Sequence, residues 1–180
     1  MTGAGQTINP SGRTLQISGT STKDLGRTLT NAGMAQFMGG AGISAATSTA
    51  TWVNQTGSLL DIQADGTVFV EYWYGPLNNA GTIRKSGSTG AATIAWGLAN
   101  IGGTIEVEMG TLTLRGASGG TASSSGGTFT VASGAVLDLA SGQGFNTYGG
   151  TYTGAGSGSV QLASGTLYIN GGATFNFTGS

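Results

Sequence analysis

The sequence predicts an all-β protein, and within that class a right-handed parallel β-helix (β-solenoid) of about seven triangular rungs of 22–24 residues. Short runs alternate apolar and polar residues with period two, as in TIEV, TLTL and TFTV, which is typical of strands. Within one rung a second run follows the first by seven residues, as from Gly103 to Gly110, so a rung has about three sides. The glycine that opens a rung recurs at near-constant spacing, at Gly12, Gly33, Gly57, Gly81, Gly103, Gly127, Gly150 and Gly172.

The repeated runs come in two forms. In one form the apolar residues stand two and four positions after the glycine, as Ile105 and Val107 do after Gly103. In the other form they stand three and five positions after it, as Leu60 and Ile62 do after Gly57. A slip of one residue would turn every side chain to the opposite face, so the second form requires a wider corner or a bulge.

Amide side chains recur two residues before the repeat glycine, and Asn100 lies one residue out of phase with them. In a solenoid, equivalent corner residues stack about 4.8 Å apart, close enough for amides of successive rungs to hydrogen bond. We therefore expect a corner amide ladder, with the alternative that each amide serves only its own turn. The predicted members are Asn31, Gln55, Asn79 and Asn170.

Residues 1–180 are expected to form one domain, with residues 1–28 the least regular part. An antiparallel meander is the competing architecture, but its repeat would be about 14 residues long. Superimposing the rungs on the repeat glycines places Arg84 opposite Glu106 and Asp61 opposite Lys85, which favours the solenoid register weakly. Neither end shows a capping repeat, so we expect a fragment of a longer solenoid, stacked on neighbouring repeats, or end-to-end self-association.

Composition excludes several functional classes. Only 7% of residues are charged and the net charge is −1, so the chain is not expected to bind nucleic acid or an anionic membrane. Cysteine and histidine are both absent, which removes thiolate and imidazole chemistry, and no cofactor is expected. No stretch is long enough to insert into a membrane. The opening MTGAGQTINP is not a secretory signal, so an extracellular role would require that the signal lie outside this chain.

The carboxylates do not predict an enzyme or a metal site. Glu106 and Glu108 should lie about 7 Å apart on one strand, a separation seen in inverting glycosidases. However, parallel side chains on a flat strand do not straddle a bond, and Arg84 is expected to neutralise Glu106. A hard cation needs six to eight oxygens in one place, whereas the aspartates fall on separate rungs, at Asp24, Asp61, Asp65 and Asp138.

The most distinctive stretch is DGTVFVEYWYG at residues 65–75. If Glu71 faces solvent, alternation turns Phe69 and Trp73 outward with it. Phe69, Glu71 and Trp73 are therefore the candidate binding residues, for a sugar or a protein. The alternative is that a loop or a neighbouring rung covers them. Trp96 shares its phase with Ile94 and is expected in the core.

Threonine pairs offer another candidate surface, at Thr111 and Thr113, Thr128 and Thr130, and Thr151 and Thr153. Ice-binding solenoids resemble this locally, but they carry many aligned copies on one flat face. Here only the last two pairs are expected to align. The alternative is the ordinary strand propensity of threonine at outward positions.

The run LNNAGTIRKSGSTGAATIAWGLANIGGTIEVEMGTLTLRG, followed by GGTFTVASGAVLDL and GAGSGSV, resembles the parallel β-helix repeats of long bacterial secreted or surface proteins, the adhesin-like passengers of autotransporter and haemagglutinin type. The resemblance covers most of the chain from about Leu29 on. It implies a structural or adhesive segment at the bacterial cell surface or outside the cell, acting as a rigid stalk or fibre. The alternatives are a glycan-binding or glycan-processing module, resembling a phage tailspike or a secreted protein, and an ice-binding protein.

Overall fold

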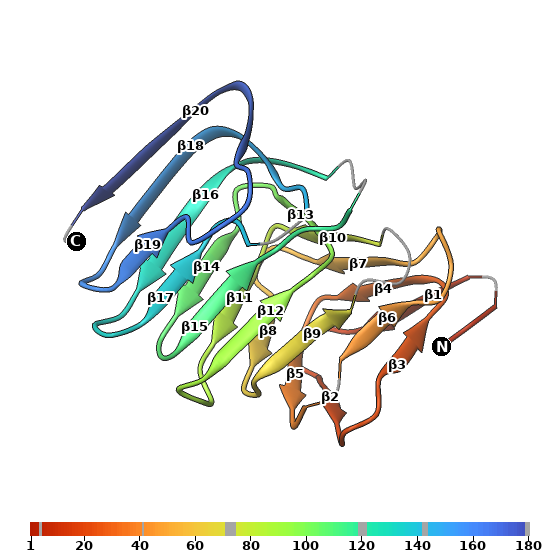
Figure 1. Ribbon diagram of the computed structural model, residues 1–180. Helices are drawn as coiled ribbons and strands as arrows, with labels where there is room; N and C mark the ends of the chain where they lie inside the picture. The colour runs from red at the N-terminus through yellow and green to blue at the C-terminus, as the bar shows by residue number, and fades with distance from the viewer. Residues whose placement is uncertain (4, 41, 71–74, 119–121, 142–143, 179–180) are drawn as a thin grey trace.

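The chain folds into a β-solenoid of about seven turns, built from strands only among the described residues. The structure is a computed structural model that describes residues 1–180 except 4, 41, 71–74, 119–121, 142–143 and 179–180. Successive turns stack along one axis, with the N-terminus at one end and the C-terminal strand at the other (Figure 1). The fold class predicted from the glycine spacing is confirmed.

Three parallel sheets form the sides of the coil, and each turn contributes one strand to each sheet through the first five turns. Sheet A contains β1 (Gln6–Asn9), β4 (Thr28–Asn31), β7 (Thr51–Asn54), β10 (Pro76–Asn79) and β13 (Gly97–Asn100). Sheet B contains β2 (Thr14–Ser18), β5 (Met34–Met38), β8 (Leu59–Ile62), β11 (Thr82–Lys85), β14 (Thr104–Val107), β16 (Ser123–Val131), β18 (Thr147–Ala155) and β20 (Tyr168–Thr178). Sheet C contains β3 (Lys23–Leu25), β6 (Ile43–Ala45), β9 (Gly66–Val70), β12 (Ala91–Ile94), β15 (Thr111–Leu114), β17 (Val136–Asp138) and β19 (Ser159–Gln161).

The segment GTIEVEMGTLTL makes two consecutive sides of one turn. Strand β14 pairs with β11 and β16 in sheet B, whereas β15 pairs with β12 and β17 in sheet C, and all four pairings are parallel. Between them Gly110 turns the chain with a φ of 67°. The competing hairpin arrangement is therefore wrong for this segment.

The two forms of the repeat correspond to two kinds of corner. Where the apolar residues come one position late, the preceding residues close a β-turn: Ser58 N donates to Gln55 O at 3.0 Å, and Arg13 N donates to Pro10 O at 3.1 Å. Gly57 occupies the third position of its turn with a φ of 79°, which that position requires. The turn absorbs the extra residue, so Leu60 pairs in phase with Ile83 and both face the core.

The core is a single column of apolar side chains that runs through the turns. The sheet B positions Leu60, Ile83 and Ile105 lie one above another, and each is fully buried. Burying an aliphatic side chain of this size contributes roughly 1.5 to 3 kcal/mol. Trp52 lies in the same core, between Leu29 and Leu77 of sheet A.

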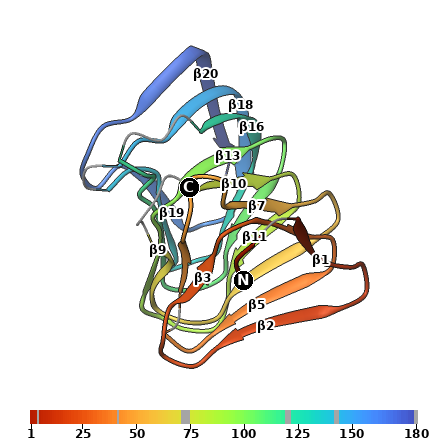
Figure 2. The same ribbon diagram turned by 90° about the vertical axis from the view of Figure 1, so that its right-hand side faces the viewer.

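Sheet A ends at β13, and the cross-section of the coil changes there (Figure 2). The edge of β13 is covered by side chains. Ser124 Oγ accepts from Asn100 N at 2.9 Å and donates to Leu98 O at 3.1 Å, while Asn146 Oδ1 accepts from Leu98 N at 3.1 Å. The later turns instead use the long strands β16, β18 and β20, of 9, 9 and 11 residues, which extend sheet B beyond its earlier width.

Of the two predicted pairings of opposite charges on neighbouring strands, one is observed. Arg84 lies opposite Glu106, as expected, but Asp61 also lies opposite Arg84, and Lys85 lies opposite Ile62. The prediction that Asp61 faces Lys85 is wrong because the β-turn before β8 shifts that strand by one residue relative to its repeat glycine.

Candidate functional site

Phe69, predicted as an exposed aromatic, is fully buried. Strand β9 pairs with β12 through Gly66 opposite Ala92, Thr67 opposite Thr93 and then Phe69 opposite Ile94, so Val68 is an extra residue at a bulge. The bulge reverses the alternation and turns Phe69 into the core, which corrects the prediction. Glu71 and Trp73, the other two predicted binding residues, lie outside the described residues.

Phe69 belongs to a cluster of four buried aromatic rings in the middle of the coil. Its ring centroid lies 5.3 Å from Phe37, 5.4 Å from Trp52 and 5.1 Å from Trp96. Trp96 is fully buried, as predicted, and its Nε1 donates to Val70 O at 2.9 Å. Aromatic pairs of this kind contribute about 0.5 to 1.5 kcal/mol beyond the area they bury. Phe69 therefore contributes to the packing of the core and is not available to bind a ligand at the surface.

A ladder of buried asparagines runs along one corner of the coil. Each sheet A strand ends in an asparagine, and each Nδ2 donates to the Oδ1 of the next one at 2.7 to 2.8 Å. Most also donate to a backbone carbonyl of the next turn, such as Asn54 to Thr82 O at 3.0 Å. Asn100 ends the ladder by donating to the carbonyls of Gly103 and Gly126. The ladder consists of Asn9, Asn31, Asn54, Asn79 and Asn100, each no more than 7% exposed.

Two of the four predicted ladder residues are members. Asn31 and Asn79 occupy the ladder, whereas Gln55 is exposed and its neighbour Asn54 takes the position. Asn170 is also exposed, because no strand of sheet A exists in the last turns. The missed members were visible as an asparagine three residues before the glycine, as at Asn54 and Gly57, and at Asn100 and Gly103.

The outer face of sheet B carries a charge cluster centred on Asp61, which is only 1% exposed. Arg84 Nε donates to Asp61 Oδ1 at 3.1 Å and Nη2 donates to Oδ2 at 3.3 Å. Ser86 Oγ and Gln63 Nε2 each donate to the same carboxylate at 2.7 Å. Burial alone would raise the pKa of Asp61, but these hydrogen bonds and the positive charge of Arg84 outweigh it, so the pKa lies below its ordinary value.

Glu108 joins the edge of this cluster, with its Oε1 3.6 Å from Arg84 Nη1. The Asp61 carboxylate is the stronger partner, and the hydrogen bond from Arg84 to it raises the pKa of the guanidinium. Arg84 therefore ties three successive turns together. Arg84 lies opposite Glu106 in the sheet register, as predicted, but it forms ion pairs with Asp61 and Glu108.

A second polar cluster surrounds Lys85, whose side chain points inward and is fully buried. Its Nζ donates to Ser88 O at 2.6 Å and Ser88 Oγ at 2.5 Å, and lies 3.5 Å from Asp65 Oδ1. Ser88 Oγ in turn donates to Asp65 Oδ1. These contacts link the corner before β9 to the corner after β11.

No group of three or more acidic side chains that could hold a metal ion occurs within the described part of the chain. Nor does any described segment form a helix of the length and apolarity needed to cross a membrane.

The predicted threonine alignment, Thr128 with Thr151 and Thr130 with Thr153, is wrong by two residues. Thr151 pairs with Gly126, Thr128 pairs with Thr153 and Thr130 pairs with Ala155, so one threonine column continues across the two strands. That column extends further than the sequence indicated, through Thr104 and Thr82. Thr111 and Thr113 lie on sheet C, away from the others.

Comparison with family models, with curated proteins and with solved structures finds no match to this chain. The site must therefore be interpreted from its own geometry. Within the described residues that geometry joins turns to one another, through the amide ladder, the Asp61 cluster and the Lys85 cluster.

Proposed function

We propose that this chain is a structural segment of a bacterial cell-surface or secreted protein, where it serves as a rigid stalk or adhesive fibre rather than an enzyme. The observation that carries the proposal is the buried asparagine ladder, which links five successive turns side chain to side chain. The resemblance of the repeats to adhesin-like passengers supports the same role.

The ladder is suited to resisting force along the axis. Pulling one turn from the next must break an amide hydrogen bond inside the core as well as the strand pairings of three sheets. Leaving a buried donor or acceptor without a partner costs about 1 to 3 kcal/mol. Seven turns at strand spacing make a rod of about 33 Å, so repeated copies of such a unit would hold a terminal domain away from a surface.

Two measurements test this role. Antibodies raised against the folded chain should label intact cells of the producing organism, and labelling only after permeabilisation would contradict the surface location. Under axial pulling of a single molecule, the native chain should resist higher force than Asn54→Ala, with Gln55→Ala as the matched control. Equal forces for all three would remove the mechanical basis of the proposal.

Ice binding is a second candidate, favoured by one observation, the aligned column Thr82, Thr104, Thr128 and Thr153 on the outer face of sheet B. Thermal hysteresis of the native chain, abolished by Thr128→Lys with Thr153→Lys, would support it. The charged neighbours Arg84 and Glu106 stand beside the first half of the column and work against a flat ice-binding face. Absence of hysteresis in the native chain at high concentration would dismiss this candidate.

A further inference from the structure

We propose that the side chains of Lys85 and Asp65 become joined by an amide bond, a covalent cross-link between two successive turns of the coil. Lys85 is the last residue of β11, and Asp65 lies in the corner before β9, one turn earlier. The chain contains no cysteine, so its turns cannot be joined by disulfides. The inference goes beyond the proposed function, because the reacting groups lie within the folded chain wherever the protein is located.

The amine and the carboxyl group are already in contact. The Lys85 side chain is fully buried, and its Nζ lies 3.5 Å from Asp65 Oδ1. Ser88 Oγ accepts from Lys85 Nζ at 2.5 Å and donates to Asp65 Oδ1 at 2.5 Å. The hydroxyl therefore bridges the two groups and offers a short path for a proton between them.

Gly90 makes room for the carboxyl group. A Cβ atom at residue 90 would lie 2.3 Å from Asp65 Oδ2 and 2.6 Å from its Cγ, which is closer than Cβ atoms approach in proteins. The φ of Gly90 is not in the left-handed region, so space rather than backbone conformation requires glycine here. The Asp65 carboxyl group is thereby held against the corner that contains Ser88.

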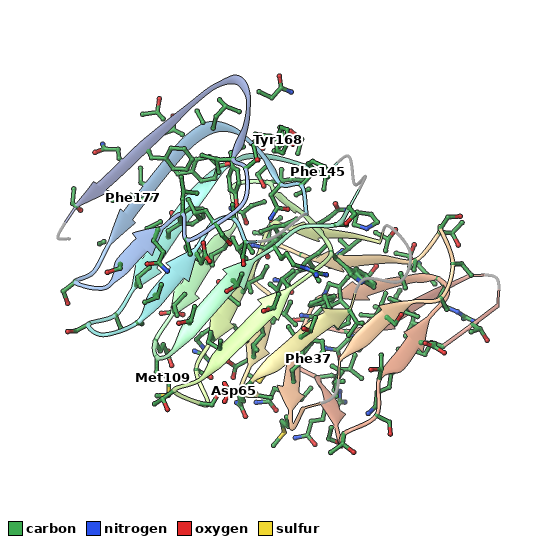
Figure 3. The ribbon with its side chains drawn as sticks, in the orientation of Figure 1. Phe37, Asp65, Met109, Phe145, Tyr168 and Phe177 are labelled. Atoms are coloured by element: carbon green, nitrogen blue, oxygen red, sulfur yellow. The ribbon has the colours of Figure 1, made fainter. Side chains whose placement is uncertain are left out.

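The site is enclosed by turns on both sides. Strand β8, which precedes Asp65, pairs with β5 of the turn before, and β11 pairs with β14 of the turn after. That later turn also covers the corner, because Thr111 N donates to Gly90 O at 3.1 Å. Figure 3 shows Asp65 and Met109 on the same side of the coil, where sheets B and C meet. Neither end of the chain contributes to the site.

The reaction is a condensation that needs no oxidant and no co-reactant. A proton first passes from the Lys85 ammonium through Ser88 Oγ to the Asp65 carboxylate, which gives an amine and a carboxylic acid. The lone pair of Nζ then forms a bond to Cγ, a proton moves from the nitrogen through Ser88 Oγ to the departing oxygen, and the C–O bond breaks to release water. Groups held together in this way react with effective molarities of about 10⁵ to 10⁸ M. The Asp65 side chain is 49% exposed, so the released water leaves directly to solvent.

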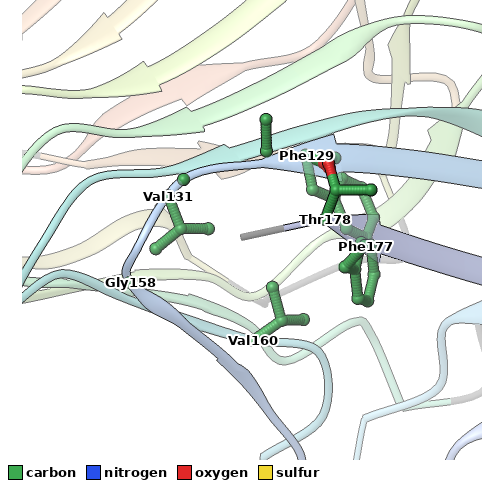
Figure 4. Close-up of a pocket in the computed structure, with 9 residues that line it drawn as sticks. Phe129, Val131, Gly158, Val160, Phe177 and Thr178 are labelled. Atoms are coloured by element: carbon green, nitrogen blue, oxygen red, sulfur yellow. The ribbon is translucent and has the colours of Figure 1, made fainter. Parts of the chain in front are cut away.

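Lys23 differs from Lys85 in its partners. Its Nζ donates to the backbone carbonyls of Ser18 and Ser21, each at 2.6 Å. The hollow of about 70 Å³ beside Phe177 (Figure 4) differs too, because its described lining consists of apolar residues, glycines and Thr178. A buried ammonium is costly to keep away from water, and amide formation removes that charge. The combination of buried amine, bridging hydroxyl and adjacent carboxyl group distinguishes the Lys85 site.

The intact mass of the chain tests the proposal. Chain purified in urea, before it folds, should have the mass calculated from its sequence. After refolding it should be lighter by one water molecule, and the change should persist on return to urea because the bond is covalent. Trypsin should then release residues 28–84 joined to residues 85–115, since it does not cleave after an acylated lysine. A chain without the bond yields residues 28–84 and 86–115 separately.

Variants separate the amine, the carboxyl group and the hydroxyl. Lys85→Arg keeps the charge but lacks the primary amine, so it should keep its full mass, whereas the matched control Lys23→Arg should lose water as the native chain does. Asp65→Asn should reach the same final mass as the cross-linked native chain, since ammonia leaves in place of water. Ser88→Ala should slow the reaction about a hundredfold, because the proton relay is lost.

A refolded native chain that keeps its full mass would overturn the proposal. So would loss of water in Lys85→Arg, because the bond would then lie elsewhere. Neither outcome bears on surface labelling, so failure here leaves the proposed function to its own tests.

Discussion

The first five turns and the turns that follow are built on the same repeat but are held together differently. In the first five turns, three sheets enclose a core whose corner is a continuous amide ladder, and charged side chains lie around its outer faces. In the later turns sheet A is absent, Tyr152 and Phe175 stack with ring centroids 5.0 Å apart, and Asp138 is the only charged residue. The comparison shows that turns with the same glycine period can stack with or without a strand in sheet A.

The physical difference between the two regions lies in what completes each layer. An asparagine in the ladder has a partner on both sides once the next turn is present, so interior layers are fully satisfied. An aromatic ring in a stack gains buried area from the neighbouring layers but makes no such hydrogen bonds to them. The ladder region should therefore be the more stable part of the chain.

Removing an aromatic ring should give the largest difference in stability loss between the two regions. Phe69→Ala in the buried cluster should lower the free energy of unfolding by about 4 kcal/mol, because a large cavity forms among tightly packed rings. Phe177→Ala at the open end should lower it by about 1 to 2 kcal/mol, because that ring is only partly buried. Urea unfolding measures both, and equal losses would show that the end is as well packed as the centre.

Breaking the ladder should have the next largest effect. Asn54→Ala leaves the Asn31 amide, the Asn79 Oδ1 and the Thr82 carbonyl without the partner that each has now. We expect a loss of about 3 kcal/mol. The exposed neighbour Gln55→Ala should stay within about 0.5 kcal/mol of the native chain. A loss below about 1 kcal/mol for Asn54→Ala would mean that water replaces the missing amide.

The smallest expected effect concerns Asp61. Its pKa in the folded chain lies below the unfolded value of about 3.9, so its contribution is complete above that pH and is lost as the pH falls through the folded-state pKa. Asp61→Asn should cost about 1 to 2 kcal/mol at neutral pH, and the loss should shrink on acidification. Urea unfolding between pH 7 and pH 2 measures this, with the exposed Asp24→Asn as control. A pH-independent loss would show that packing, rather than charge, explains the effect.

Most of the stacking could be predicted from the sequence, because glycine spacing and period-two alternation are local features that repeat. The sequence predicts an amide ladder and two of its members, Asn31 and Asn79, but it indicates Gln55 where the ladder contains Asn54. The cause is the extra residue in the β-turn before β8, which shifts the distance between the strand end and the repeat glycine by one. Register taken from one glycine cannot detect such a shift.

Other features could not be predicted because they depend on distant turns. The bulge at Val68 turns Phe69 inward, where Trp52 and Trp96 from the turns on either side provide its contacts. Strict alternation gave the opposite face. The end of sheet A likewise depends on Ser124 and Asn146, which lie 24 and 48 residues beyond the backbone groups that they satisfy. No local pattern marks either residue for that role.

Hydrogen exchange of the backbone amides tests the central claim most directly. If the amide ladder makes the first five turns the stable part, amides in β7, β8, β10 and β11 should exchange at least about tenfold more slowly than those in β18 and β20. In Asn54→Ala that difference should shrink. Equal protection along the whole chain, unchanged in Asn54→Ala, would contradict the account.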